Sequence, residues 1–411
     1  MSKFLKVMIV LLTIVAVATP VMAEDRLSLA GQMRVRGWHI DDGGDSTESF
    51  MDQRLRIGGK LSIAEGVSVT FRTDLTEKTW GDGGNTFGAG RLPQDGMQVD
   101  RAHLDLAAGN LHFRAGQQYI AFGNSGFDAQ DAGLTLNVMG PIPVTAFWML
   151  ADDNDVAGSA AGFAINQSTG AIEPVAAVDA NTKSDAFYYG ARVAHKGGSY
   201  ASQLFVAGQQ DVNNGDESVQ VVGLTLDLDL APVKLYGEAE FFTGDADANT
   251  DAFGSQVMLD ASMAATEIVT VGGQIFYAMG TDKADEQQYV VLGNDFGGWD
   301  PLFALGTGLD NEQIGAGRPY DLFGGSNGVM AGRLYTSVKA TDAATIGLSV
   351  AYAEPDEDIV GLDSAIALAA GLNYAVMANT KLGLQLEYID IDDDADTDET
   401  FNAGVGLFVN F

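Results

Sequence analysis

Apolar and polar residues alternate with a period of two over most of the chain from Leu27 onward. Successive side chains of a β-strand point to opposite faces, so this alternation is typical of strands with one apolar and one polar face. Each alternating stretch is about ten residues long and ends in a cluster rich in Gly, Asp and Asn, which marks a turn or loop. The pattern predicts eighteen strands, at residues 27–38, 51–63, 66–80, 97–107, 111–122, 133–139, 143–151, 186–196, 200–210, 218–230, 233–242, 254–263, 267–279, 329–340, 344–353, 364–377, 380–391 and 400–411.

The connections between these strands are of two kinds, short and long. Residues 64–65 and 378–379 are tight turns, whereas residues 152–185 and 280–328 are long enough to form external loops. Short turns at one end and long loops at the other are typical of a transmembrane antiparallel up-and-down β-barrel. We therefore expect an all-β barrel of eighteen strands, with sixteen as the alternative count. A secreted β-sandwich also alternates, but it rarely sustains so many strands with such links.

The predicted barrel must be closed and hollow. Unpaired backbone groups in hydrocarbon cost several kcal/mol each, so an open sheet edge is excluded from a bilayer. Eight strands enclose only their own side chains, whereas eighteen enclose an aqueous lumen. In the last strand Phe401 and Val405 share the face expected to meet lipid, opposite Asn402 and Asn410. Aromatic residues near strand ends are expected to form girdles at the membrane interface, namely Trp38, Trp80, Phe122, Tyr189 and Tyr388.

The amino terminus has the pattern of a secretory signal peptide. A basic start with Lys3 and Lys6 precedes an apolar run over residues 7–18, and small residues flank the end of Val21-Met22-Ala23. That run is about 12 residues long, shorter than the roughly 20 that a spanning helix needs. We expect residues 1–23 to be a signal peptide cleaved after Ala23, and residues 24–411 to form the barrel.

Charge and cysteine content exclude several classes of protein. The formal net charge of −34 argues against nucleic-acid binding, which depends on clustered Lys and Arg. There is no cysteine, so an exported chain of this kind has no disulfide scaffold. Residues 390–395 carry alternating acids but lack the Gly and Glu positions of an EF-hand loop. We predict no metal site and no cofactor.

Arginine is concentrated in the first third of the predicted barrel. Nine of the twelve arginines that follow the signal peptide lie between Arg26 and Arg114. Charge on the lipid face costs roughly 2 to 4 kcal/mol near the bilayer midplane, so these side chains are expected to point inward. Seven of them should line one wall of the pore: Arg34, Arg36, Arg54, Arg56, Arg72, Arg101 and Arg114.

Carboxylates are expected at other places around the lumen. The inward positions of later strands hold Asp227, Asp229, Glu238 and Glu240. A transverse field between these acids and the arginine wall would align dipolar solutes. The alternative is that the charges pair with one another and only make the wall rigid. Inward bases and acids are comparable in number, so we expect weak ion selectivity.

The carboxyl-terminal sequence resembles that of Gram-negative porins. The chain ends in Gly406-Leu407-Phe408-Val409-Asn410-Phe411, similar to the porin pattern of Gly and alternating apolar residues before a final Phe. Residues 113–118, Phe-Arg-Ala-Gly-Gln-Gln, are similar to a Gly-Arg-Gln signature that porins carry in the fifth strand, with Gln117 at the usual Arg. The resemblance implies that outer-membrane assembly machinery reads Gly406, Leu407, Val409 and Phe411.

The same resemblance carries further expectations. Residues 123–132, with Asp128 and Asp131, would be the loop that folds into the pore. Because they are fewer than in the usual porin loop, either they narrow the pore less or the long loops 152–185 and 280–328 share in narrowing it. The protein would be a homotrimer in the outer membrane of a Gram-negative bacterium, in contact with lipid and lipopolysaccharide. Its function would be passive diffusion of small polar solutes and ions. A channel selective for sugars or organic acids is the alternative, and acidic loops that bind divalent cations remain open.

A barrel hydrolase is the rival class of function. The chain offers four histidines as bases, His39, His103, His112 and His195. His103 and His112 fall on neighbouring strands, but no Ser or Asp is spaced to suggest a nucleophile or a metal set. We therefore interpret them as ordinary pore-wall histidines and predict that the protein is not an enzyme.

Overall fold

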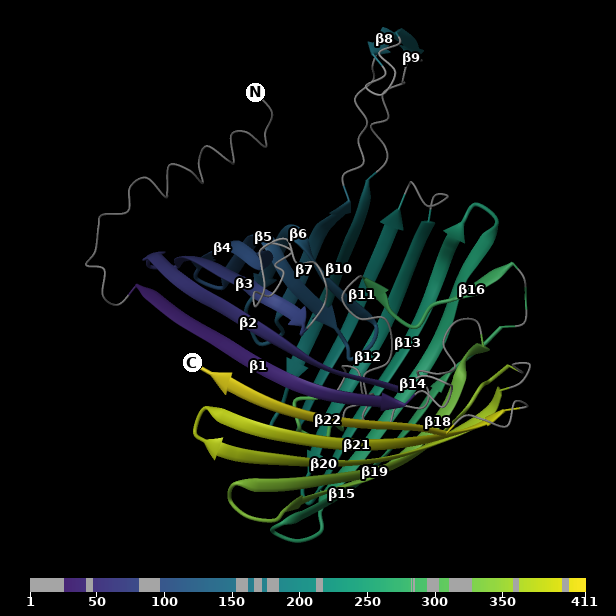
Figure 1. The fold of residues 1–411 in the computed structure, drawn as a ribbon. Coiled ribbons are helices and arrows are strands. Elements are labelled where there is room, and N and C mark those ends of the chain that lie inside the picture. Colours follow the sequence, from purple (N-terminus) through teal and green to yellow (C-terminus); the bar gives the residue numbers. More distant parts are fainter. Residues whose placement is uncertain are drawn as a thin grey trace.

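A computed structural model of the chain describes residues 26–41, 47–80, 97–152, 162–165, 172–175, 185–211, 217–281, 283, 285–293, 303–309, 327–357, 362–393 and 399–411. These residues form a closed antiparallel barrel of eighteen strands (Figure 1). The predicted all-β barrel and its strand count are confirmed. The strands of the wall are β1 (Leu27–Asp41), β2 (Thr47–Ala64), β3 (Val67–Thr79), β4 (Gln98–Ala108), β5 (Leu111–Phe122), β6 (Phe127–Val138), β7 (Val144–Asp152), β10 (Ala186–Lys196), β11 (Tyr200–Asp211), β12 (Glu217–Leu230), β13 (Val233–Asp247), β14 (Thr250–Ala264), β15 (Val269–Ala278), β18 (Val329–Lys339), β19 (Ala344–Glu354), β20 (Leu362–Met377), β21 (Thr380–Asp393) and β22 (Glu399–Asn410).

The wall closes where the first and last strands meet. β1 pairs antiparallel with β22 over ten residue pairs, from Gln32 with Asn410 to Asp41 with Phe401. Figure 1 shows these two strands side by side near the chain ends. The short strands β8 (Gly162–Ile165) and β9 (Ile172–Val175) pair only with each other, outside the wall. Every edge of the main sheet is therefore paired, as a bilayer requires.

The outward face is a belt of large apolar side chains. Leu204, Leu224 and Leu334 are exposed, and so are Phe401 and Leu407 of the last strand. Their neighbours in sequence point the other way, so the predicted register holds for the carboxyl-terminal strand. Within the described residues no helix is long and apolar enough to cross a membrane.

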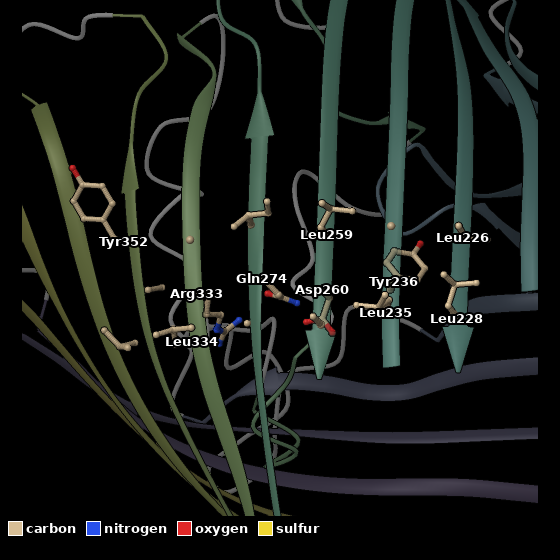
Figure 2. A pocket seen from close by; sticks show the side chains of 17 residues that line it. Leu226, Leu228, Leu235, Tyr236, Leu259, Asp260, Gln274, Arg333, Leu334 and Tyr352 are labelled. Carbon is tan, nitrogen blue, oxygen red and sulfur yellow. The ribbon is translucent and has the colours of Figure 1, made fainter. Parts of the chain in front are cut away.

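The outward face also carries a shallow apolar hollow of about 800 Å³. Figure 2 shows leucines of neighbouring strands around it, among them Leu226, Leu259 and Leu334. Gly237 and Gly273 also line it, together with the polar residues Asp260, Gln274 and Arg333. Because this hollow opens on the belt that faces lipid, it is not part of the solute path.

The β5–β6 hairpin leaves the wall and folds inward. β4 pairs with β5 only as far as Gln117, and β7 pairs with β6 only from Ala132 onward. Between these points the two strands of the hairpin pair with each other, joined by a turn over residues 123–126. We expected residues 123–132 to be one loop, but residues 127–132 belong to β6.

An apolar cluster explains why this hairpin is held inside. Phe122 and Phe127 of the hairpin pack on Phe147, with ring centroids 5.2 and 4.9 Å apart. The cluster continues over the inner face of the neighbouring wall through buried Tyr188, Phe205, Val219, Val221 and Phe242. The inner face here is therefore apolar, since it buries the hairpin instead of meeting water.

Part of residues 280–328, expected as an external loop, also lies within the barrel. β16 (Glu286–Gln288) pairs in parallel with β14, and β17 (Leu292–Gly293) pairs in parallel with the start of β6. Between them the chain crosses the inner face of the wall, where Val290 O accepts a hydrogen bond from Gln256. The fully buried Leu292 joins the apolar cluster, and this burial explains the inward path.

Residues 303–309 form a second inward segment, which we call the strap. Its Leu305 and Leu309 are buried against the inner face of β19–β22.

Two of the aromatic residues expected at the membrane interface pack inward instead. Trp38 packs on Leu309 and Phe408, and Phe122 lies in the apolar cluster, so neither side chain faces the membrane interface.

Candidate pore constriction

The arginine wall is built by period-two spacing on neighbouring strands. Arg34 of β1 lies directly opposite Arg54 of β2, and Arg72 of β3 lies opposite Arg101 of β4. Like charges directly across a strand pair repel each other. The wall therefore needs carboxylates between its arginines.

Those carboxylates come from the same strands. Asp52 accepts from Arg36 Nε at 2.8 Å and from the Trp38 indole at 2.6 Å. Asp74 accepts two hydrogen bonds from Arg56, at 2.5 and 2.7 Å. Further pairs join Arg34 to Glu77, Arg72 to Asp100, and Arg114 to Asp105. The sequence analysis missed these five acids, although Asp52 and Asp74 have the same period-two phase as the arginines beside them.

The arginines and their partners differ in exposure. The side chain of Arg72 is 30% exposed and that of its partner Asp100 only 6%. Arg56 is 23% exposed and its partner Asp74 only 8%. In these two pairs, which lie on β2–β4, the arginine is therefore the more exposed partner and the carboxylate is buried. In the pair between β1 and β3 the exposure is reversed: the arginine, Arg34, is buried and its partner, Glu77, is exposed.

The inward hairpin brings Asp128 toward this wall. Tyr119 donates a hydrogen bond to Asp128 Oδ2 at 2.9 Å, and the guanidinium of Arg101 lies 5.6 Å from the centre of the Tyr119 ring. Asp131, three residues further along β6, is half-buried opposite Gln118. Arg101, Tyr119 and Asp128 thus connect the arginine wall to the hairpin.

The predicted acids of the far wall divide into two pairs. Glu238 and Glu240 of β13 are buried beneath the hairpin turn, where they bond to Asn124 and Ser125. Asp227 and Asp229 of β12 remain exposed near a short turn of the barrel. Of the four acids, Asp227 and Asp229 are therefore the two that face water.

The strap covers another sector of the lumen. Arg333 of β18 donates to Phe303 O at 3.2 Å, and the Phe303 ring stacks on Tyr335 at 4.1 Å between centroids. Lys381 Nζ donates to Gly306 O at 2.9 Å, and Thr307 Oγ1 donates to Gln385 at 2.7 Å. Sequence reasoning missed this segment because residues 303–309 have no strand periodicity.

Within the described part of the chain, no group of three or more His, Cys, Asp or Glu side chains is placed to hold a metal ion. His103 lies 3.1 Å from Asp105, which also binds Arg114, so it belongs to the charge network of the wall.

The chain is similar to known proteins in sequence and in fold. The profile of a family described as Gram-negative porin matches residues 10–295. No curated protein sequence matches the chain significantly.

Solved structures share the fold over nearly the whole length. OccK9 (OpdG) of Pseudomonas aeruginosa is 12% identical with a TM-score of 0.61, covering 94% of this chain and 98% of that one. OccK2 (OpdF) of the same organism, solved in complex with glucuronate, is 10% identical with a TM-score of 0.59, covering 95% and 99%. A BenF-like porin from Pseudomonas fluorescens is 12% identical with a TM-score of 0.57, covering 94% and 99%.

Proposed function

Because this chain belongs to the Gram-negative porin family, whose members are outer-membrane channels, we propose that its lumen carries small polar solutes by passive diffusion and favours those with a carboxylate. The barrel provides the channel, since eighteen strands enclose a lumen too wide for wall side chains alone to fill.

The observation that carries the solute preference is the unequal exposure within the arginine wall. The side chains of Arg56 and Arg72 are more exposed than those of their partners, Asp74 and Asp100. A partly exposed guanidinium that a buried carboxylate holds in place presents a planar, positively charged hydrogen-bonding group to the lumen, and this geometry suits the recognition of carboxylates. Passing carboxylates would therefore meet a row of oriented donors.

Selectivity between small ions is proposed to be weak. The seven wall arginines are matched by five carboxylates on the same strands, Asp52, Asp74, Glu77, Asp100 and Asp105. The local excess of positive charge is thus small, and Asp227 and Asp229 add exposed negative charge elsewhere in the lumen. The wall arginines would distinguish solutes by the geometry of the hydrogen bonds that each solute can form, more than by the net charge of the solute.

Single-channel recording of purified protein tests the proposed preference. Glucuronate should interrupt the open current at lower concentration than glucose. Arg72→Gln should raise the half-blocking concentration of glucuronate about tenfold, the equivalent of about 1.4 kcal/mol for one charge-assisted hydrogen bond. Lys339→Gln, at an exposed turn, is the matched control and should leave block unchanged. Equal block by both solutes would favour a sugar channel and contradict the proposal.

The assembled state is proposed from family membership. We propose a homotrimer in contact with lipid and lipopolysaccharide, exported by cleavage after Ala23 and recognised by the assembly machinery through Gly406, Leu407, Val409 and Phe411. Residues 1–25 lie outside the described part of the chain. In the described β22, Leu407 is exposed on the outer face and the backbone pairs with β1. Chemical cross-linking tests the homotrimer, amino-terminal sequencing tests the cleavage, and deletion of Phe411 tests the recognition.

A further inference from the structure

The hollow on the outward face is built around three glycines of neighbouring strands. Gly237 of β13, Gly273 of β15 and Gly332 of β18 all face outward, because each pairs directly across the sheet with an exposed Leu or Ile. A glycine has no side chain, so the surface of the sheet is recessed at these positions. The hollow is rimmed by large aliphatic side chains, which are Leu226, Leu228, Leu235, Leu259, Ile275 and Leu334.

The polar residues that line the hollow direct their side chains toward the lumen. Asp260 accepts a hydrogen bond from the Tyr335 hydroxyl at 3.0 Å, and Arg333 donates to Phe303 O of the strap at 3.2 Å. Gln274 lies in the same phase of the sheet, because it pairs directly with both Asp260 and Arg333. The hollow therefore presents aliphatic side chains and glycine backbone to its outer side.

No described residue lies over the three glycines. A Cβ atom at Gly332 would meet only the carbonyl oxygen of Gln274, at 4.0 Å. At Gly237 and Gly273 the nearest atom to the Cβ position belongs to a leucine of the rim, 3.2 Å away. The hollow of about 800 Å³ is thus open to the surroundings, and its volume lies within the range of about 300 to 1,000 Å³ that ligand sites occupy.

Other outward glycines of the wall are covered by the chain itself. An aromatic ring lies against the Cβ position of each of three such glycines, on β1, β2 and β11. These pairs are Gly31 with Phe411, Gly59 with Phe71 and Gly208 with Tyr189. A ring that covers a strand glycine replaces the contacts that the missing side chain would make. An uncovered strand glycine is typical of a place where a ligand or another chain approaches the backbone.

The position of the hollow in the belt indicates what reaches it. The hollow is continuous with the apolar belt, which meets hydrocarbon in a membrane. At one end Leu228 and Leu235 flank the short turn at residues 231–232, and short turns lie at the periplasmic end of outer-membrane barrels. The lipid that meets this end of the belt is a phospholipid of the periplasmic leaflet.

A second copy of the chain fits the hollow less well than a lipid does. Its outer wall is convex, so it would rest on the leucine rim above the glycines. Seventeen residues line the hollow, fewer than the 20 to 30 or so that each partner contributes to a standard protein interface. A slender hydrocarbon chain can reach the glycines and supply the contacts that an empty hollow lacks.

We propose that this hollow is a binding site for one acyl chain of a phospholipid of the periplasmic leaflet. Gly237, Gly273 and Gly332 let the chain approach the backbone, and the leucines hold it from the sides. Close packing drives this binding, because lipid chains and leucines are equally apolar and the hydrophobic effect adds nothing inside a bilayer. The site lies on the outer face of the wall, so it does not depend on which solutes pass through the lumen.

Native mass spectrometry of the purified protein in detergent tests this site. The protein is titrated with dioleoylphosphatidylethanolamine, and the same spectra report the bound lipids and the number of protomers. The native protein should retain one phospholipid per protomer. The double variant Gly237→Leu, Gly332→Leu fills the hollow from two strands and should bind this phospholipid about tenfold more weakly. Gly332→Leu alone meets no atom closer than 4.0 Å and should weaken binding by a smaller factor.

The matched control is the double variant Ala102→Leu, Ala239→Leu. Both alanines are exposed and lie outside the hollow, so this variant should bind the phospholipid as the native protein does. Equal phospholipid binding by the native and filled proteins, or an equal loss in the control, would overturn the proposal. So would retention of lipopolysaccharide in place of the phospholipid. Dissociation of an oligomer in the filled variant, with its lipid retained, would assign the hollow to a second copy instead.

Discussion

At the scale of single residues, the lumen is organised by buried charges that have partners. Arg36 is buried and binds Asp52, which also accepts the indole N–H of Trp38. Burying a charge is tolerable only when it is paired and hydrogen-bonded. Asp52 is therefore expected to stabilise the β1–β2 pairing as well as to balance charge.

Substitution of Asp52 by alanine tests this role. Asp52→Ala leaves the buried Arg36 and Trp38 N–H without that acceptor, so we expect a loss of about 3 to 5 kcal/mol in the free energy of unfolding. Urea denaturation in detergent, followed by tryptophan fluorescence, measures the loss. Asp342→Ala is the control, because Asp342 is fully exposed in its pair with Lys339 and should change stability very little. Equal stability of the two variants would show that the Arg36 pair contributes nothing.

At the scale of elements, the sequence predicted the wall strands closely because period-two alternation is strong along them. Predicted strands 111–122 and 186–196 coincide with β5 and β10. The start of β6 was missed because the resemblance to porins assigned residues 123–132 to the inward loop, whereas Phe127 and Ala129 are strand residues buried in the apolar cluster. Trp38 was assigned to the interface because its position near a strand end gives no sign of the strap that covers it.

The strap packs against glycine residues on the inner face of the wall. Four glycines, one on each of four adjacent strands, leave room for it: Gly347, Gly371, Gly383 and Gly406. The carbonyl of Thr307 lies directly against Gly383, where a Cβ would overlap it. We call the space above these four glycines the groove. The positions of the glycines in the sequence do not reveal it, since glycines are frequent throughout the chain.

Filling the groove should release the strap. Thr307 is 0% exposed, so Thr307→Cys in this cysteine-free chain should react slowly with maleimide. Adding Gly383→Val should raise that labelling rate about tenfold or more by opening the segment locally. Gly198→Ala, where a Cβ meets nothing within 4 Å, is the matched control and should leave the rate unchanged. A slow rate in the Gly383→Val variant would contradict the packing of the strap on β21.

At the scale of the whole molecule, three inward features divide the lumen. The arginine wall lies on β1–β5, the hairpin turn covers Glu238 and Glu240, and the strap covers the inner face of β19–β22. The partly exposed side chains of Arg56 and Arg72 lie on β2 and β3, within the arginine wall. Solutes should therefore pass along the arginine wall.

Swelling of proteoliposomes tests the central claim most directly. Vesicles containing the purified protein are diluted into iso-osmotic glucuronate, glucose or glucosamine, which are similar in size and differ in charge. We predict swelling with all three solutes and the fastest swelling with glucuronate. The double variant Arg56→Gln, Arg72→Gln should lose this preference. Absence of swelling with every solute would contradict the channel, and equal rates for glucuronate and glucose would contradict the role of the arginine wall.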